Sequence, residues 1–253
     1  MSKALLEVIN LQKAFGRVVT AKDLNLVLEP GVLTSLIGPN GAGKSTLINM
    51  VTGFLGPDSG RIIFQGQEIT HLPIHRRVCL GLCRSFQVAN IFPNLSVLEN
   101  VAIPALAARK RAHRLFGGVA RETAACRDAE AVLDRIGLRG RAHYPARALP
   151  HGDQRLLEIG IALAARPRLL FLDEPTAGMN PQERSRILGS IRQLSAAGEI
   201  TFVIVEHDMD IVFSLSERVI VLHRGEIIGD GSPEEIQRHS KVREIYLGEE
   251  GSG

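Results

Sequence analysis

Cysteine is scarce in this chain of 253 residues, which contains Cys79, Cys83 and Cys126 at uneven spacing. So few cysteines disfavour a disulfide framework and a structural zinc site, which takes about four ligands. A metal held by Cys79 and Cys83 is the remaining alternative, although two thiolates fall short of that ligand set. The cysteine content therefore favours a reducing compartment.

Long apolar runs are also missing. Nowhere do about 18 apolar residues follow one another, as a membrane-spanning helix requires, and residues 1–7 lack the apolar run of a signal peptide. We therefore expect a cytoplasmic protein that reaches a membrane only through other subunits. Residues 251–253 are expected to form a flexible tail.

The chain has no large excess of one charge. It carries 30 Lys and Arg against 27 Asp and Glu, a net charge of +3, which does not favour nucleic acid as a partner. Its hydrophobic content of 45% is sufficient for a packed core in one large domain or two smaller ones. These numbers predict a globular protein with no nucleic-acid partner.

A glycine-rich segment at 38–46 fits the phosphate-binding pattern G-x-x-x-x-G-K-S/T. It lies between the apolar segments 32–37 and 47–50, which predict a buried strand before it and a helix after it. Glycines let backbone N–H groups surround an anion, and the helix N-terminus attracts negative charge. The predicted nucleotide-binding residues here are Gly38, Pro39, Asn40, Gly41, Ala42, Gly43, Lys44, Ser45 and Thr46.

Within this segment, Lys44 is expected to reach the outer phosphates and Ser45 to bind Mg²⁺. A chance glycine-rich turn is the alternative, and it would not require the flanking strand and helix.

Two carboxylates, Asp173 and Glu174, follow a second apolar run at 169–172. Open α/β sheets bind ligands at the carboxyl ends of their strands. Asp173 is therefore expected to be an outer ligand of Mg²⁺, and Glu174 to orient or deprotonate the attacking water. The alternative is an acidic pair that caps a helix before Pro175. Together with the glycine-rich loop, the pair predicts nucleotide hydrolysis.

Three further segments carry weaker signals. His207 follows the apolar run 203–205, so it is expected beside Glu174, within reach of a γ-phosphate, although a lone histidine is more often structural. Gln87 is a candidate contact of Mg²⁺ or water, or simply a surface amide. Residues 149–154 open an apolar-striped helix, which is either another anion site or an ordinary helix start.

Strand and helix signals suggest an order of elements. Alternating apolar residues in 5–37 and a hairpin around Gly66 predict an antiparallel layer of short strands. Between 96 and 165 helical spacing replaces strand signals, and strands return at 169–172 and 200–205 in a βαβ rhythm. We therefore predict the α/β fold of a P-loop NTPase, a RecA-like parallel sheet core with an antiparallel β layer and an inserted α-helical subdomain. The predicted domains are an ATP-binding core at 1–87 and 160–250, and the helical subdomain at 88–159.

Taken in order, these segments resemble those of the ATP-binding subunits of ABC transporters, over nearly the whole chain. Residues 38–46 match the family's Walker A loop, 149–154 its signature segment, 169–174 its Walker B strand and 177–180 its D-loop. The resemblance implies a fold and an ATPase activity with Mg²⁺. It also implies roles for single residues: adenine stacking by Phe15, the Q-loop for Gln87, the switch histidine for His207 and the catalytic base for Glu174.

The chain departs from the family pattern at two places. The family signature begins Leu-Ser-Gly-Gly-Gln, so the serine hydroxyl that would hydrogen-bond the γ-phosphate is missing here, a bond that contributes roughly 1.5–3 kcal/mol. We hypothesise that His151 partly replaces it. Asn180 stands where the D-loop generally carries Asp. The signature residues, expected to face a partner's nucleotide, are Leu149, Pro150, His151, Gly152, Asp153 and Gln154.

The resemblance also implies partners. In this family two subunits enclose ATP, so we expect a second ABC ATPase subunit, a sibling or a copy of this chain. Transmembrane permease subunits would dock on the helical subdomain, where Phe86, Ile91 and Phe92 offer an apolar groove unless they fill the subdomain's core. A solute-binding protein would act indirectly. The chain would then lie peripherally at the cytoplasmic face of the inner membrane.

The segments 81–87, 173–179, 206–209 and 246–249 look like those of the branched-chain amino acid importers. Urea and short-chain amide importers share this appearance. A soluble ABC ATPase of iron–sulfur cluster assembly is the alternative from another class, and the catalytic segments do not exclude it.

Overall fold

The computed structural model describes residues 4–85, 91–108 and 123–249. The chain divides into two compact units, Met1–Arg77 with Gly198–Gly253, and Val78–Ala197. The second unit is longer than the predicted helical subdomain, 88–159, because it also contains the strand and the helix that follow residue 165. The predicted division groups residues by function and stays a prediction. The predicted tail, 251–253, lies outside the described residues.

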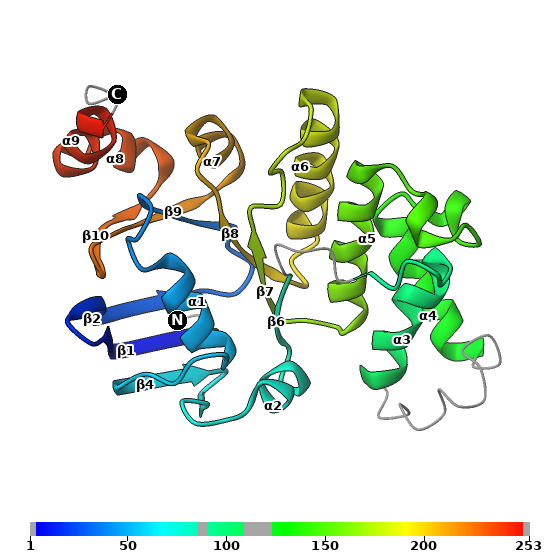
Figure 1. Cartoon of the computed structure of the whole chain (residues 1–253), viewed down its shortest axis with the longest axis horizontal. Coiled ribbons are helices and arrows are strands. Elements are labelled where there is room, and N and C mark those ends of the chain that lie inside the picture. The colour runs from blue at the N-terminus through cyan, green and yellow to red at the C-terminus, as the bar shows by residue number, and fades with distance from the viewer. Residues whose placement is uncertain (1–3, 86–90, 109–122, 250–253) are drawn as a thin grey trace. The chain divides into compact units, whose positions relative to one another are not determined.

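An antiparallel sheet in the first unit has the strand order β2-β1-β4-β5 (Figure 1). β1 (Leu6–Phe15) and β2 (Val18–Leu28) form one long hairpin, and β4 (Ser59–Phe64) pairs with the other edge of β1. β5 (Gln67–Glu68) completes the predicted hairpin at Gly66. The antiparallel layer is thus confirmed, but β1 and β2 are longer than the short strands predicted. Register shifts interrupt the alternation of apolar and polar residues, so the sequence pattern indicated several short strands where there are two long ones.

The first unit also contains parallel strands. β3 (Thr34–Ile37) lies between β8 (Thr201–Val205) and β9 (Arg218–His223) and runs parallel to both. Every residue of β3 and β8 is buried, as in strands covered on both faces. β10 (Glu226–Gly231) pairs antiparallel with β9. The carboxyl ends of β3 and β8 therefore reach the same edge of the sheet.

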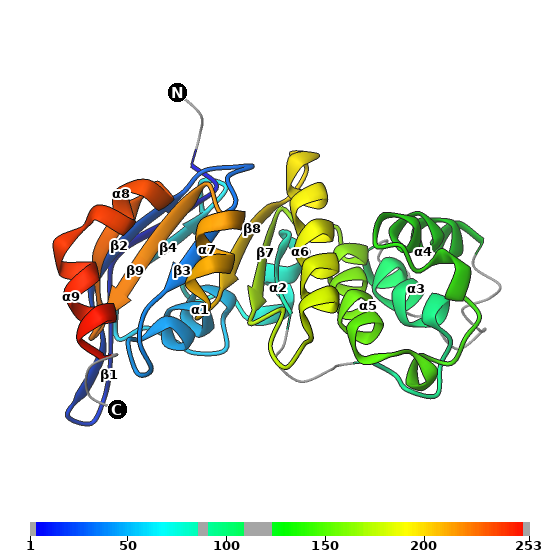
Figure 2. The ribbon, with the colours of Figure 1, turned by 90° about the horizontal axis from the view of Figure 1, so that it is seen from above.

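Helices pack around these strands (Figure 2). α8 (Pro233–Arg238) and α9 (Ser240–Glu249) lie beside β9 and β10, and α7 (Met209–Leu215) precedes β9 in the chain. α1 (Lys44–Thr52) directly follows the glycine-rich loop after β3. One core cluster of this unit joins strands and helices through Ile37, Val212, Val219, Val221, Ile236 and Val242.

The second unit combines a short parallel pair of strands with helices. β6 (Leu82–Arg84) pairs with β7 (Leu169–Asp173), and α6 (Pro181–Ala196) packs on α5 (His151–Ala164). The other helical elements are α3 (Val97–Ala108), α4 (Thr123–Arg135), η3 (Arg139–Arg141) and η4 (Ala146–Ala148). They confirm the helical spacing predicted between 96 and 165. Among the described residues, none of the helices has the length and apolar character needed to cross a membrane.

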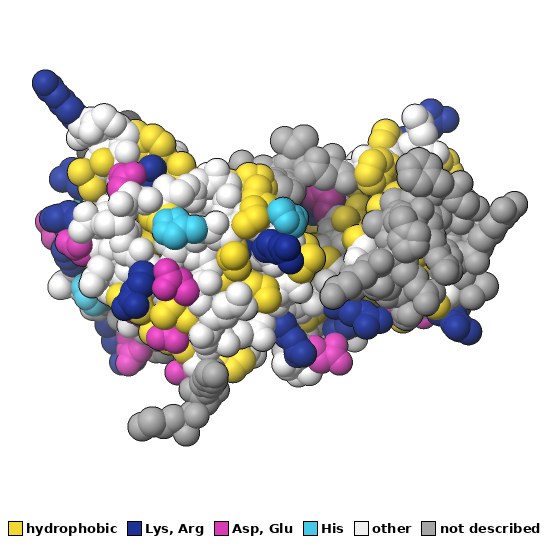
Figure 3. Space-filling view, turned by 90° about the horizontal axis from the view of Figure 1, so that it is seen from below, with side chains coloured by type: hydrophobic (Ala, Val, Ile, Leu, Met, Phe, Trp, Pro, Cys, Tyr) yellow, Lys and Arg dark blue, Asp and Glu magenta, His cyan; other side chains and the backbone are white. Residues whose placement is uncertain are grey.

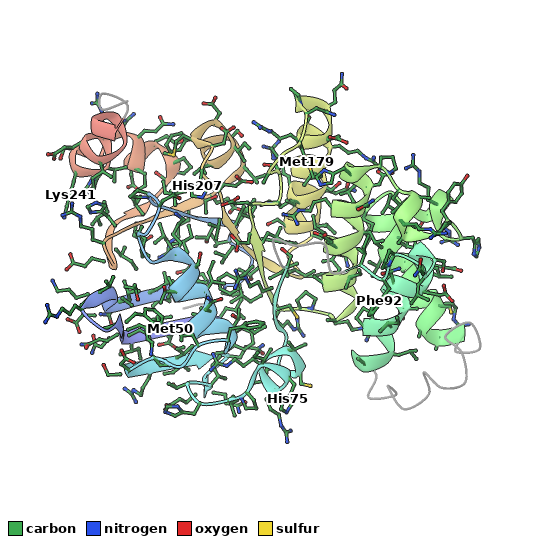
Figure 4. The ribbon with its side chains drawn as sticks, viewed as in Figure 1. Met50, His75, Phe92, Met179, His207 and Lys241 are labelled. Atoms are coloured by element: carbon green, nitrogen blue, oxygen red, sulfur yellow. The ribbon has the colours of Figure 1, made fainter. Side chains whose placement is uncertain are left out.

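The end of α1 far from the glycine-rich loop is held by Arg77 of α2 (Ile74–Cys79). This guanidinium is 2% exposed and donates to the carbonyl oxygens of Met50 and Val51, each at 2.6 Å. It also donates to Thr70 O at 2.9 Å and Leu72 O at 2.8 Å, and its burial lowers the pKa of Arg77. Met50, labelled in Figure 4, belongs to the last turn of α1, where a cation is favourable.

We predict that Arg77→Ala lowers the free energy of unfolding by about 3 kcal/mol, because carbonyls of α1 lose their donors and a cavity opens beside them. Urea denaturation measures the change. Arg76→Ala is the matched control, since Arg76 is the exposed neighbour on the same helix. Equal stability of the two variants would contradict this role of Arg77.

Candidate functional site

The glycine-rich loop joins the end of β3 at Ile37 to the start of α1 at Lys44, as predicted. Gly43 precedes the helix with a φ of 107°, in the left-handed region that favours glycine. A Cβ on Gly43 would overlap the carbonyl oxygen of Thr20, and one on Gly38 would overlap that of Leu222. Neighbouring backbone therefore requires glycine at both ends of the loop, and the flanking strand and helix that a chance glycine-rich turn would not require are both present.

The amino group of Lys44 is folded back onto the loop. Its Nζ donates to Gly38 O at 2.5 Å and to Pro39 O at 3.1 Å, and the residue is 7% exposed. Ser45, the next residue, is exposed in the first turn of α1. The loop thus combines a buried cation, an accessible hydroxyl and a helix N-terminus, a combination suited to phosphate.

Phe15 lies at the end of β1, where the hairpin turns. Its side chain is 52% exposed, and Lys13 Nζ lies 5.6 Å from the centre of its ring. Lys13 itself is held by Asp58 at 2.6 Å. The predicted stacking residue is therefore an accessible aromatic with a cation beside it, and its role in adenine binding stays a prediction.

His207 follows β8 and precedes α7 (Figure 4). The preceding Glu206 is buried, whereas His207 is exposed. Asp208 caps α7 by accepting from the N–H groups of Asp210 and Ile211. The apolar run before His207 is thus a buried strand, β8, and the placement of His207 beside Glu174 stays a prediction.

Asp173 and Glu174 leave the carboxyl end of β7, whose residues are all buried. No helix begins at Pro175; the next one, α6, begins at Pro181 with Asn180 as its N-cap, so the pair does not cap a helix. Asp173 Oδ2 accepts from Arg84 Nη2 of β6 at 2.6 Å. Glu174 is half-buried and has a φ of 44°, which is unusual for a residue with a side chain.

The signature residues form the start of α5. Pro150 is the N-cap, and the exposed His151 begins the helix. Asp153, where the family has Gln, is 2% exposed, with Oδ1 at 2.5 Å from Arg186 of α6 and Oδ2 paired with Arg141 of η3. Because two arginines compensate this carboxylate, α5 accommodates a negative charge in the first turn of a predicted anion site.

The D-loop residue Asn180 has a structural role in this chain. Its side chain accepts from the N–H of Glu183 at 2.9 Å, and Glu183 bonds back to the N–H of Asn180, forming a capping box for α6. Asn and Asp cap helices about equally well, so this role is compatible with either residue.

The predicted permease groove is described in part. Phe92 is 52% exposed and labelled in Figure 4, so it does not fill the subdomain's core, and Ile91 is half-buried. Phe86 and the predicted Q-loop residue Gln87 lie outside the described residues. On the face drawn in Figure 3, apolar side chains form scattered patches interrupted by polar and charged ones.

Two arginines at the acidic strand end escaped the sequence analysis. The sequence predicted no role for Arg84 or for Arg155. Arg155 Nη2 donates to Glu174 O at 2.9 Å and to Asp173 O at 3.3 Å. The available signal was their position, one at the end of an apolar strand and the other within a largely buried helix.

Comparisons with known proteins agree with this arrangement. The family model described as ABC transporter matches residues 21–177, and the model described as Branched-chain amino acid ATP-binding cassette transporter matches 226–252. The chain is 37% identical over 256 residues to the high-affinity branched-chain amino acid transport ATP-binding protein LivG of Escherichia coli (strain K12), covering 98% of this chain and 100% of the relative. It is 35% identical to the probable LivG of Archaeoglobus fulgidus, covering 98% and 97%.

Solved structures give the same result. A crystal structure of the ADP conformation of an ATP-binding cassette of an ABC transporter superposes with a TM-score of 0.86 at 32% identity, covering 97% of this chain and 99% of that one. A nucleotide-free ATP-binding cassette from an ABC transporter gives a TM-score of 0.84 at 33% identity, covering 96% and 99%. The chain therefore belongs to the ATP-binding proteins of the ABC transporter family, and it has their P-loop ATPase fold.

Proposed function

We propose that this chain is the ATP-hydrolysing subunit of an ABC importer for branched-chain amino acids. The assignment of the solute rests on two similarities. Residues 226–252 match the model described as Branched-chain amino acid ATP-binding cassette transporter, and the chain is 37% identical to LivG over 98% of its length. In this proposal it pairs with a second ABC ATPase subunit and with transmembrane permease subunits, and a solute-binding protein delivers the amino acid. Its place is the cytoplasmic face of the inner membrane, where it is bound peripherally.

In this mechanism the glycine-rich loop binds the ATP phosphates. Lys44 exchanges its carbonyl partners, Gly38 and Pro39, for phosphate oxygens, and the N–H groups at the start of α1 add further donors. Phe15 stacks on the adenine, since its ring is accessible. The loop thus supplies binding energy and holds the γ-phosphate in place for attack.

Ser45 and Asp173 are the residues that fit Mg²⁺, with Gln87 as a third contact. An exposed hydroxyl and a carboxylate offer the oxygen ligands that this ion prefers. When bound, Mg²⁺ would neutralise charge on the phosphates. Arg84 Nη2 holds Asp173 Oδ2 at the end of β7.

Glu174 is the base that takes a proton from the attacking water, and His207 donates a hydrogen bond to the γ-phosphate. The signature helix α5 serves the nucleotide of the partner subunit, where Gly152 N–H and His151 take the place of the family's serine.

We predict that Glu174→Gln slows ATP hydrolysis by about 10²- to 10⁴-fold while ATP binding is retained, because a neutral amide cannot accept the proton of water. Phosphate release measures turnover, and a fluorescent ATP analogue measures binding. Lys44→Ala is the contrasting variant: it should weaken binding, since a charged contact to phosphate is lost. Full turnover by Glu174→Gln would remove Glu174 from its assigned role.

We predict that His151→Ala lowers ATP hydrolysis by the assembled transporter about 10-fold, the effect of one charge-assisted hydrogen bond. His143→Ala is the control, because this histidine is also exposed and belongs to the same unit. The same rate in both variants would show that His151 does not replace the missing serine.

The solute and the class of protein are tested by purification from membranes. We expect this chain to co-purify with a permease of many membrane spans and with a solute-binding protein that binds leucine and not urea. Binding of urea alone would indicate the amide importers. Purification with only soluble partners would instead favour an ABC ATPase of iron–sulfur cluster assembly.

A further inference from the structure

One side chain, Arg155, bonds to the backbone at the end of β7 and just after it. Arg155, in the second turn of α5, donates to three successive carbonyl oxygens: Asp173 at 3.3 Å, Glu174 at 2.9 Å and Pro175 at 3.4 Å. Asp173 is the last residue of β7, and Glu174 and Pro175 lie in the bend and turn that follow it, where the regular hydrogen bonding of the sheet ends. Arg155 therefore fixes the direction in which the chain leaves the sheet.

The arginine is in turn held by Glu158, one turn further along α5. Arg155 Nη1 lies 2.7 Å from Glu158 Oε2, and the two side chains are only 12% and 8% exposed. Both lie on a helix whose neighbouring residues Leu156, Leu157 and Ile159 are buried. A guanidinium with so little access to water has few alternative orientations, and its planar fork spreads its donors over several acceptors.

Glu174 has the backbone conformation that most requires such support. Its φ of 44° lies in the left-handed region, which is unfavourable for a residue with a side chain. Its carbonyl accepts from Arg155 and also from the N–H of Ala177 at 3.2 Å. These donors fix the peptide plane after Glu174, and the Cα–Cβ direction of Glu174 follows from that plane.

We propose that Arg155 is a positioning residue for the carboxylate of Glu174. It holds the left-handed turn that aims this carboxylate, and it makes that aim depend on α5, the helix that carries the signature residues. The inference rests on the proposed role of Glu174 as base, and it adds a residue that acts through Glu174. Misplacement of a reacting group by about 1 Å can cost about 10²-fold in rate, so a support of this kind has a measurable effect.

Two variants test the proposal with ATP hydrolysis by the assembled transporter. Arg155→Lys keeps a cation for Glu158 but loses the fork, so kcat should fall about 10-fold while KM for ATP stays within about 2-fold. Arg155→Met combined with Glu158→Met removes the whole ion pair without stranding a charge and should lower kcat about 10²-fold. Arg192→Lys, at an exposed position of α6, is the control. Unchanged kcat in both test variants, with normal melting temperatures, would overturn the proposal.

A double-mutant cycle separates positioning from a general structural effect. If Arg155 acts through Glu174, the loss caused by Arg155→Lys should disappear in the Glu174→Gln background. The same fold-loss in both backgrounds would overturn the proposal. Failure of the proposed function would be seen differently, as full-rate hydrolysis by Glu174→Gln alone.

Discussion

The functional parts of this chain depend on one kind of interaction, in which a largely buried cationic side chain donates hydrogen bonds to main-chain carbonyl groups. Lys44 binds carbonyls of the glycine-rich loop, Arg77 those at the end of α1, and Arg155 those after β7. Each cation fixes backbone where regular hydrogen bonding stops. Loop, helix and strand end are thereby held in place by three side chains, of which one, Lys44, is assigned to the nucleotide itself.

This interaction also marks the limit of what the sequence predicts. The loop at 38–46 and the acidic strand end at 173–174 were found because a pattern and an apolar run are local signals. Arg77 and Arg155 bind carbonyls, which every residue possesses, so no motif predicts these contacts, and the pairing of Arg155 with Glu158 does not reveal them. The strands β1 and β2 were predicted too short for a related reason. Asn10 and Asp23 adopt positive φ within them, and the alternation of apolar residues breaks there.

Two departures from the family pattern, Asp153 and Asn180, are best considered together. Asp153 replaces a neutral amide, and Arg141 and Arg186 accompany it, so the buried charge of α5 is compensated from two other elements. Asn180 is neutral where the family has an acid, and its amide oxygen caps α6, the helix that carries Arg186. Both substitutions thus affect contacts made by α5 or α6. A buried carboxylate at position 153 is tolerated because Arg141 and Arg186 pair with it.

The contacts of Lys44 with two carbonyl oxygens of the loop have a consequence for the nucleotide cycle. The ammonium gains when phosphate arrives, because phosphate oxygens are charged and carbonyl oxygens are not, but this gain is reduced by the two carbonyl bonds that it gives up. The flexible side chain of Lys44 is also ordered before phosphate binds, which reduces the conformational entropy that is lost on binding. The lost carbonyl bonds lower the net gain from phosphate, and the prior ordering raises it. The same two carbonyls can receive the ammonium again when the nucleotide leaves, so the loop provides acceptors for Lys44 at both stages of a transport step.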